Sequence, residues 1–244
     1  MWQTWCCDAR DGLAALPDNC VDLIVTDPPY RGISGGNAVG KDGLGRYGRP
    51  TGMLTKNDGK YFRHNDIDVT EYAAHLYRVL TSPGHCYVMS NLINLWRFHE
   101  EFTRVGFKVH NLLVWHKNTT NPNRWFMKNG EYILFLRKGP ARSIYTPGAQ
   151  TVTKVKNVTG TQRQHPTEKP VELMQQYVLA SSLPGQVILD PFMGAGSTGV
   201  AALREGRRFI GFESDLQHYT AAYGRLTQHG EAIRQDDARG TARR

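Results

Sequence analysis

The chain has 244 residues, of which 40% are hydrophobic and 21% charged, and its mean hydropathy is −0.49. This composition is typical of a globular protein, and the length suits one domain with a sizeable core. No apolar run approaches the roughly 18–20 residues that span a bilayer, and the first residues lack the pattern of a signal peptide. We therefore expect a cytoplasmic protein that does not associate with membranes.

The four cysteines, Cys6, Cys7, Cys20 and Cys86, form no C-x-x-C pair. Adjacent cysteines such as Cys6 and Cys7 have poor geometry for a disulfide. We expect free thiols and no metal site.

The net charge of +8 is unevenly distributed along the chain. Residues 31–60 carry six Lys/Arg against two Asp/Glu, and residues 117–169 carry ten against two. The rest of the chain carries fourteen against eighteen, so the whole basic excess lies in these two segments. A run of charge is usually a solvated face, but two basic segments on an acidic body favour a surface for a polyanion.

The first part of the chain alternates strands with helices. We expect a strand at Gln3–Cys7, a helix at Asp8–Leu16, a strand at Val21–Thr26, a long glycine-rich loop at 31–60, a helix through Val69–Leu80 ended by Pro83-Gly84, and a strand at His85–Ser90. Asp68 and Glu71 resemble a capping box at the start of the second helix.

The second part continues this alternation. The expected elements are a helix at Leu95–Val105, strands at Lys108–Trp115 and Glu131–Arg137, a helix at Pro170–Ser182, a strand at Gln186–Leu189, a helix at Thr198–Glu205, a strand at Arg208–Glu213 and a helix at Leu216–Gln228. This order predicts an α/β domain with a largely parallel sheet. We place one domain at 1–230, with the basic segments inserted as loops 31–66 and 117–168, and a frayed polar tail at 231–244.

The first chemical motif is Thr26-Asp27-Pro28-Pro29-Tyr30, directly after a buried strand. It should lie at the carboxyl edge of the sheet, where α/β proteins bind ligands. Asp27 and the carbonyl of Pro28 can accept hydrogen bonds from the N–H groups of an exocyclic amine. The prolines stiffen the turn, and Tyr30 offers a face on which a base can stack. On its own, the motif is also compatible with a rigid strand-ending turn.

The second motif runs from Asp190 through Gly194 and Gly196 to Thr198, between an expected strand and an expected helix. Glycines permit a tight turn and the close approach of a ligand, and the N–H groups of a helix start attract anions. Glu213 ends the next strand, where a carboxylate can accept hydrogen bonds from ribose hydroxyls. A third motif is His165-Pro166-Thr167-Glu168-Lys169-Pro170, in which Thr167 and Lys169 could hold a carboxylate.

Together and in this order, the three motifs resemble the β group of amino-methyltransferases acting on DNA. The resemblance spans roughly residues 3–228. It implies an S-adenosylmethionine-dependent methyltransferase fold, which is Rossmann-like: a mixed, mostly parallel sheet of seven strands with helices on both faces, and the catalytic half first in the chain. The cofactor would be S-adenosylmethionine and the main partner double-stranded DNA. The family also admits a homodimer and a cognate restriction endonuclease as partners, in a prokaryote or a phage.

The resemblance assigns roles to individual residues. The catalytic turn would be Asp27, Pro28, Pro29 and Tyr30. Residues that bind the cofactor would be Asp8, Thr167, Lys169, Asp190, Pro191, Phe192, Gly194, Gly196, Ser197, Thr198 and Glu213. Cys7 replaces the glycine that the family often has before Asp8.

The two basic segments would hold DNA, because one follows the catalytic turn and the other lies where the family keeps its target-recognition region. The candidates for DNA contact are Arg31, Arg46, Arg49, Asn121, Asn123, Arg124, Lys128 and Asn129, whose side chains suit phosphates or base edges.

Asp27 favours adenine as the target, because similar enzymes that methylate cytosine N4 mostly carry serine at this position. Three alternatives remain: a cytosine N4-methyltransferase, a methyltransferase of RNA or of protein amides, and an inactive DNA-binding relative. A nicotinamide dehydrogenase fits less well, because Gly194-x-Gly196 reaches Gly199 only inside the expected helix and the Asp27 turn would have no role.

Overall fold

The computed structural model describes residues 1–29, 67–121, 126–158 and 168–241. Its strands are β1 (Trp2–Cys6), β2 (Val21–Thr26), β3 (Leu80–Ser90), β4 (Lys108–Asn121), β5 (Lys128–Lys138), β6 (Val152–Lys154), β7 (Val187–Asp190) and β8 (Arg208–Glu213). Its helices are α1 (Ala9–Ala15), α2 (Ala73–Val79), α3 (Leu92–Arg104), α4 (Val171–Ser181), α5 (Ser197–Arg204) and α6 (Leu216–Thr241), with a 3-10 turn at Val69–Glu71 before α2.

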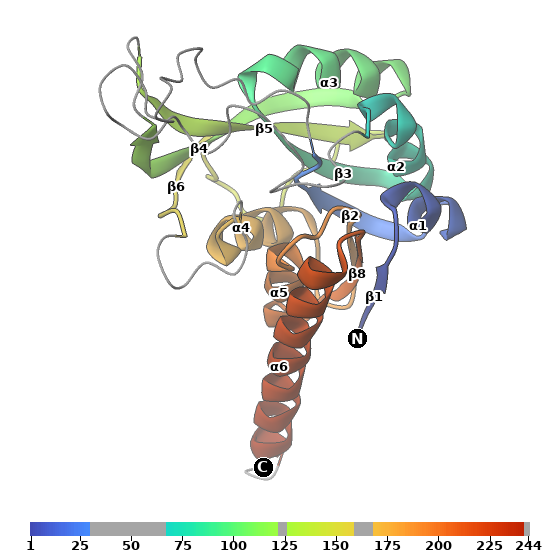
Figure 1. Ribbon diagram of the computed structural model, residues 1–244, viewed down its shortest axis with the longest axis vertical. Helices are drawn as coiled ribbons and strands as arrows, with labels where there is room; N and C mark the ends of the chain where they lie inside the picture. The colour runs from blue at the N-terminus through green and yellow to red at the C-terminus, as the bar shows by residue number, and fades with distance from the viewer. Residues whose placement is uncertain (30–66, 122–125, 159–167, 242–244) are drawn as a thin grey trace, which may run out of the picture.

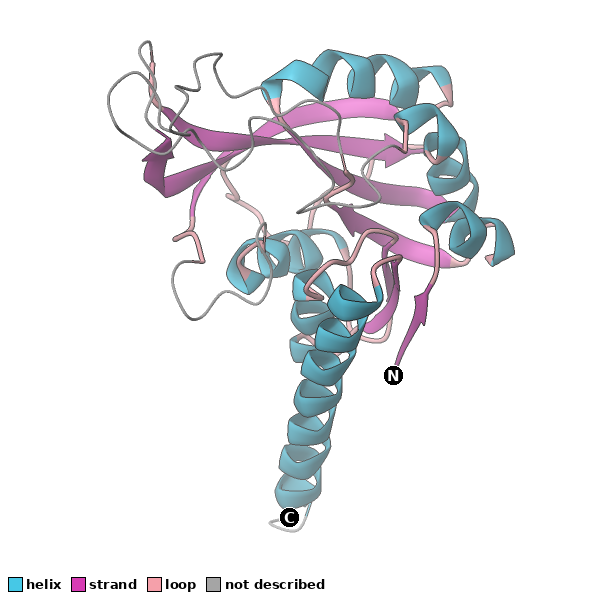
Figure 2. Ribbon diagram, viewed as in Figure 1, coloured by secondary structure: helices cyan, strands magenta, loops and turns pink. Residues whose placement is uncertain are grey.

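In the described part of the chain, one sheet of eight strands, in the order β1-β8-β7-β2-β3-β5-β4-β6, forms the centre of the molecule. Among the strands of the described residues, only β5 runs antiparallel to its neighbours. Helices α1, α2 and α3 cover one face, and α4, α5 and α6 cover the other (Figures 1 and 2). The expected α/β fold with a mixed, mostly parallel sheet is confirmed.

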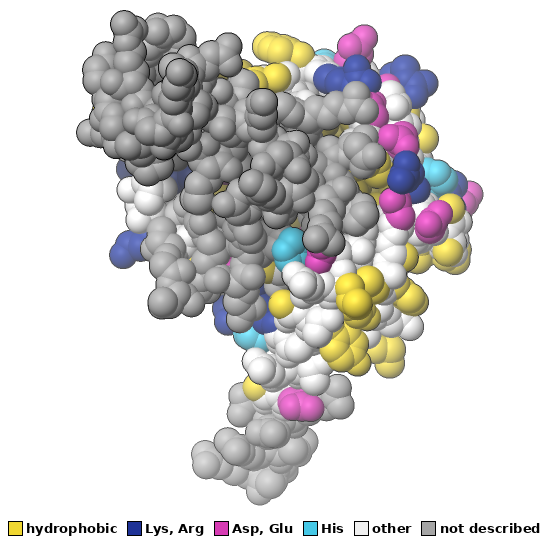
Figure 3. Space-filling model, in the orientation of Figure 1, with side chains coloured by type: hydrophobic (Ala, Val, Ile, Leu, Met, Phe, Trp, Pro, Cys, Tyr) yellow, Lys and Arg dark blue, Asp and Glu magenta, His cyan; other side chains and the backbone are white. Residues whose placement is uncertain are grey.

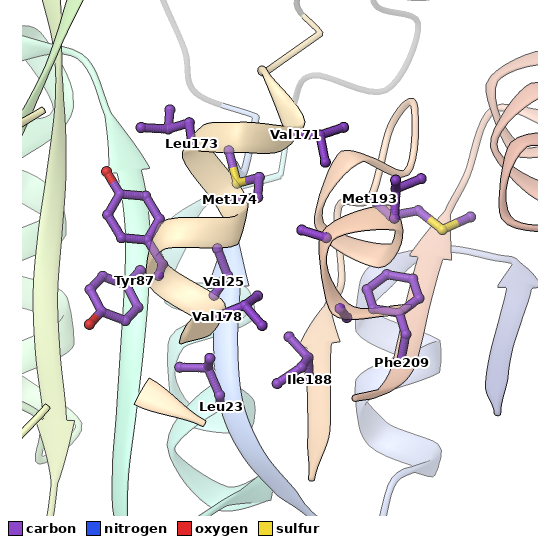
Figure 4. Close-up of a cluster of buried hydrophobic side chains, with 14 of the residues drawn as sticks. Leu23, Val25, Tyr87, Val171, Leu173, Met174, Val178, Ile188, Met193 and Phe209 are labelled. Atoms are coloured by element: carbon purple, nitrogen blue, oxygen red, sulfur yellow. The ribbon is translucent and has the colours of Figure 1, made fainter. Parts of the chain in front are cut away.

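The alternation of side chains along each strand divides the core into two layers. In β2, Leu23 and Val25 point into the layer under α4 and α5, whereas Ile24 points into the layer under α1, α2 and α3. Figure 4 shows the first layer, in which Val178 of α4 meets the sheet beside Ile188. Because both faces of the central strands are buried, Leu23, Ile24 and Val25 of β2 form an uninterrupted apolar run.

Three expectations about the elements need correction. Within the described ranges the sheet has eight strands instead of seven, because the three-residue β6, too short to show a periodicity, pairs with β4. Pro83 and Gly84 lie inside β3; Val21 pairs with Leu80 and Leu23 with His85, so the proline falls in an irregular stretch without a partner on β2. Helix α6 continues to Thr241 and so takes up most of the segment 231–244, where a frayed tail was expected. The division into one domain with two inserted loops stays a prediction.

No helix within the described ranges combines the length and the apolar character needed to cross a bilayer.

Acidic and basic side chains alternate over the α1–α2–α3 side of the molecule (Figure 3). The capping box is confirmed: Asp68 accepts the backbone N–H of Thr70 at 3.1 Å, and Glu71 accepts that of Asp68 at 2.7 Å. Arg97 donates to Asp68 at 2.7 Å and, ahead of the cap hydrogen bonds, lowers the pKa of this carboxyl to about 2.

We predict that Asp68→Ala lowers the free energy of unfolding by about 1–2 kcal/mol, because it removes both the cap and the partner of Arg97. Denaturant titration measures the effect. Asp18→Ala is the control: Asp18 is 68% exposed and pairs with Arg78, so its loss should cost at most about 1 kcal/mol. Equal losses in the two variants would contradict the prediction.

Candidate active site

Strands β2 and β7 are parallel neighbours at the point where the chain reverses the direction in which it adds strands to the sheet. From β7 the chain proceeds to β8 on one side, and from β2 it proceeds to β3 on the other. The loops that follow the two parallel strands therefore separate at the same edge of the sheet. Such a switch point is where open α/β sheets bind ligands.

A buried hydrogen bond joins the ends of these two strands. The hydroxyl of Thr26 in β2 donates to Asp190 Oδ1 in β7 at 2.8 Å, and the backbone N–H of Phe192 donates to the same oxygen at 3.1 Å. Asp190 is 4% exposed. Burial raises the pKa of Asp190 to about 7, although hydrogen bonds from Thr198 and Thr26 act in the opposite direction. The first two sequence motifs thus meet at Asp190.

The glycine loop folds back onto β8. Gly194 and Gly196 have φ angles of +48° and +75°, which residues with a side chain rarely adopt. The N–H of Gly194 donates to Glu213 Oε2 at 3.0 Å, while Glu213 Oε1 accepts the N–H of Asp215 at 2.9 Å. Apart from its chain neighbours, no atom of the described residues lies within 4 Å of a Cβ built on Gly194, so the loop leaves space at this point.

These features fit the cofactor expected from the sequence. A carboxylate oxygen has two lone pairs, so each oxygen of Glu213 can accept a ribose hydroxyl in addition to its backbone N–H. The open side of Gly194 allows a ligand to approach the backbone.

Lys169, just before α4, reaches the turn that follows β2. Its ammonium forms a hydrogen-bonded ion pair with Asp27 Oδ2, and it lies 3.6 Å from Glu131 Oε2 of β5. Lys117 of β4 pairs with the other oxygen of Glu131 and sits 4.6 Å from the centre of the Trp115 ring. Burial alone would raise the pKa of Glu131, but the charges of Lys169 and Lys117 outweigh burial and leave this pKa lowered.

Arg225 of α6 ties the glycine loop to the start of α4. It pairs with Glu168 at 2.8 Å, and it donates to the carbonyl of Ala195 at 3.0 Å and to the Ser197 hydroxyl at 3.4 Å. The side chain of Glu168 is only 3% exposed. Because this ion pair is buried and hydrogen-bonded, it fixes the loop relative to Lys169.

The remaining predicted cofactor residues lie around the same edge, some with side chains engaged by the protein. Asp8 caps α1 and accepts three hydrogen bonds from Arg10, at 2.8, 2.9 and 2.8 Å. It follows Cys7, whose N–H donates to the Glu213 carbonyl at 3.1 Å. Thr198 is buried and donates to the carbonyl of Val25 at 3.5 Å.

The prolines and Phe192 shape the edge of the site. Pro28 and Pro191 are buried and Pro29 is partly buried. The ring of Phe192 meets Tyr72 edge-on, with 5.1 Å between the ring centres.

Several predicted residues lie outside the described residues: Tyr30, Arg31, Arg46, Arg49, Asn123, Arg124 and Thr167. Asn121 ends β4 opposite Lys128, which is exposed at the start of β5. The Asn129 amide contacts His116 Nε2 at 3.1 Å.

Four residues of this site, Lys117, Glu131, Glu168 and Arg225, were not singled out from the sequence. The distribution of charge along the sequence could have identified two of them. Glu131 and Glu168 are the only acids among residues 117–169, which carry ten basic residues, and both form ion pairs beside the predicted motifs.

The profile of the DNA methylase family, which comprises N6 and N4 methyltransferases, matches residues 21–224. The chain belongs to this family. It is also 32% identical over 243 residues to the Type II methyltransferase M2.DpnII of Streptococcus pneumoniae, an alignment that covers 90% of this chain and 87% of that protein. The resemblance stated from the sequence motifs is confirmed.

Solved structures share the fold. One is TTHA0409, a putative DNA modification methylase from Thermus thermophilus in complex with S-adenosyl-L-methionine, with a TM-score of 0.69, 22% identity and coverage of 94% of each chain. Another is the cytosine-N4-specific PvuII DNA methyltransferase, with a TM-score of 0.68, 17% identity and coverage of 95% of this chain and 92% of that one. At these identities the likeness concerns the fold alone.

We predict that Asp190 makes stability depend on pH. Its pKa rises from 3.8 to about 7 on folding, so the folded state binds its proton more tightly, and the stabilisation present below pH ~4 is lost as the pH rises toward ~7. Relative to the parent, the melting temperature of Asp190→Asn should therefore rise between pH 4 and 7 and stay level above.

Asp68→Asn serves as the control for this titration. The pKa of Asp68 is about 2, so its difference from the parent should stay constant between pH 5 and 8. Parallel curves for the parent and Asp190→Asn would show that the prediction is wrong.

Proposed function

We propose that this DNA methylase transfers a methyl group from S-adenosylmethionine to the exocyclic N6 of adenine within a specific duplex sequence. The observation that carries the proposal is the position of Asp27. It follows β2 at the switch point, is paired with Lys169, and is held next to the glycine loop by the Thr26–Asp190 hydrogen bond. An aspartate at this position favours adenine over cytosine.

The cofactor lies across the ends of β7 and β8 in this proposal. Glu213 binds the ribose hydroxyls, and Lys169 with Thr167 holds the methionine carboxylate. The loop from Asp190 to Thr198, with Pro191, Phe192, Gly194, Gly196 and Ser197, surrounds the methionine and ribose portions, while Asp8 faces the adenine of the cofactor. Ser197 and Thr198 contribute mainly through backbone N–H groups, because their side chains contact Arg225 and Val25.

The chemistry needs a better nucleophile than adenine itself provides, because the N6 lone pair is delocalised into the ring. Asp27 and the carbonyl of Pro28 accept hydrogen bonds from the two N–H groups of the amine. These hydrogen bonds localise the lone pair on nitrogen. S-adenosylmethionine supplies an electrophilic methyl group. As the new C–N bond forms, the bond between the methyl carbon and the cofactor sulfur would break, and its electron pair would stay on sulfur as a neutral thioether. Asp27 stabilises the positive charge that develops on nitrogen, and one amine proton then passes to solvent. Alignment of the two reactants accounts for much of the rate.

The target base must leave the duplex, at a cost of a few kcal/mol. Stacking on Tyr30 returns about 1–3 kcal/mol. Basic and amide side chains contact DNA in this proposal. One of them, Lys128, is exposed at the start of β5. The others proposed are Arg31, Arg46, Arg49, Asn121, Asn123, Arg124 and Asn129. The name of M2.DpnII, a Type II methyltransferase, supports a role beside a restriction endonuclease.

The second candidate is N4 methylation of cytosine. The fold is shared with the cytosine-N4-specific PvuII enzyme, and the same turn can accept hydrogen bonds from the N–H groups of either exocyclic amine. The chemistry at Asp27 would be unchanged, so the product separates the two candidates.

We predict that the purified protein, incubated with unmethylated DNA and S-adenosylmethionine, produces N6-methyladenine. Digestion to nucleosides and mass spectrometry against standards identify the product. N4-methylcytosine would keep the mechanism but overturn the assignment of adenine. No modified nucleoside from several DNA sources would refute DNA methylation by this chain.

We also predict that Asp27→Ala lowers the turnover number by ~10²–10⁴, the usual scale for a positioned acid–base group, while cofactor binding largely survives. Steady-state assays measure turnover, and calorimetry measures the Kd of S-adenosylmethionine. Asp18→Ala removes an exposed carboxylate in another loop and should leave both values unchanged. Near-normal turnover of Asp27→Ala would show that Asp27 has no catalytic role.

A further inference from the structure

Four alternating charges form a row that ends at the catalytic turn. Lys117 pairs with Glu131, Glu131 lies near Lys169, and Lys169 pairs with Asp27. The four residues come from β4, β5, the segment before α4 and the turn directly after β2. Strands β4 and β5 are joined through the basic region proposed to read DNA, so the row connects that region with the site of chemistry.

The two oxygens of Glu131 are used differently. Oε1 accepts a hydrogen bond from Lys117. Among the described residues, Oε2 is buried and accepts no hydrogen bond, but it stands 3.6 Å from the Lys169 ammonium. A buried carboxylate oxygen without a hydrogen bond is unusual and needs an explanation. A small shift of Lys169 away from Asp27 would give this oxygen its hydrogen bond.

Lys169 is well placed for such a shift. Its side chain is 10% exposed, and the side chains of Asp27 and Glu131 are 22% and 24% exposed, so the three charges are only partly solvated. Charges in such surroundings interact more strongly than in bulk water. An ammonium held between two carboxylates neutralises each of them only in part.

We propose that Glu131 is a positioning residue for methyl transfer: it shares the Lys169 ammonium with Asp27 and takes a larger share when Asp27 accepts the N–H of the target amine. The inference rests on the proposed function, in which Lys169 also faces the cofactor carboxylate. Lys117 tunes this sharing from the other side, because its positive charge limits the attraction of Glu131 for Lys169.

Two opposite consequences follow from removing the charge of Glu131. Lys169 would neutralise Asp27 more completely, so the carboxylate would be a weaker acceptor and transfer would be slower. The ammonium would also have one anion fewer around it, so it would attract the cofactor carboxylate more strongly. A general defect in folding or packing would instead impair both binding and transfer.

The test uses the full chain and Glu131→Gln, which keeps the size of the side chain. We expect the Kd of S-adenosylmethionine, measured by calorimetry without DNA, to fall by about 3–10-fold. We expect the single-turnover rate, at saturating cofactor and DNA, to fall by about 10-fold. Glu131→Asp should recover at least part of the lost rate.

A double-mutant cycle shows whether Glu131 acts through Lys169. In a Lys169→Met background, adding Glu131→Gln should change neither the Kd nor the rate by more than about 2-fold. Lys117→Met should have the opposite effect on binding and raise the Kd by about 2–3-fold, because Glu131 then attracts Lys169 more strongly. Glu101→Gln is the matched control, since it removes a carboxylate paired with Arg104 on α3, and it should leave both values unchanged.

The inference is overturned if Glu131→Gln weakens cofactor binding, if its transfer rate equals that of the parent, or if its effects persist in the Lys169→Met background. Methylation of DNA by the parent protein tests the proposed function separately. If the parent binds the cofactor but methylates no DNA, the proposed function fails, and the Kd values of the cycle still decide whether Glu131 acts through Lys169.

Discussion

The hydrogen bond between Thr26 and Asp190 is the contact on which the site depends. It joins the last residues of β2 and β7 at 2.8 Å, in a place where Asp190 is almost fully buried. The segments after these strands are the Asp27 turn and the glycine loop. Since an isolated buried carboxylate is costly, the hydrogen bonds that Asp190 accepts keep the two loops in a single arrangement.

Two ion pairs extend this arrangement to the rest of the molecule. Lys169 brings the segment before α4 to Asp27, and Arg225 brings α6 to both Glu168 and the glycine loop. The two neighbouring residues Glu168 and Lys169 thus contact opposite sides of the site. A methylase must hold a cofactor and a base in line, and these contacts give the loops the rigidity that such alignment needs.

The sequence predicted the order of the elements well where both faces of a strand or one face of a helix are buried. Strand β2 begins and ends at the predicted residues, and the bounds of α4 and β8 differ little or not at all. Prediction failed where pairing with a distant strand decides the conformation. The proline at position 83 is compatible with β3 only because the adjacent register on β2 is irregular, and β6 exists only through β4.

The sequence by itself determined the family and the candidate residues, because the Asp27 turn, the glycine loop and the Lys169 segment are local motifs whose chemistry can be read from residue type and order. Only the tertiary structure decided which charges meet. Lys169 lies 142 positions from Asp27 in the chain and still forms its ion pair, and Glu131 joins them from β5. Contacts of this kind depend on the order of strands in the sheet, a non-local property that no short motif encodes.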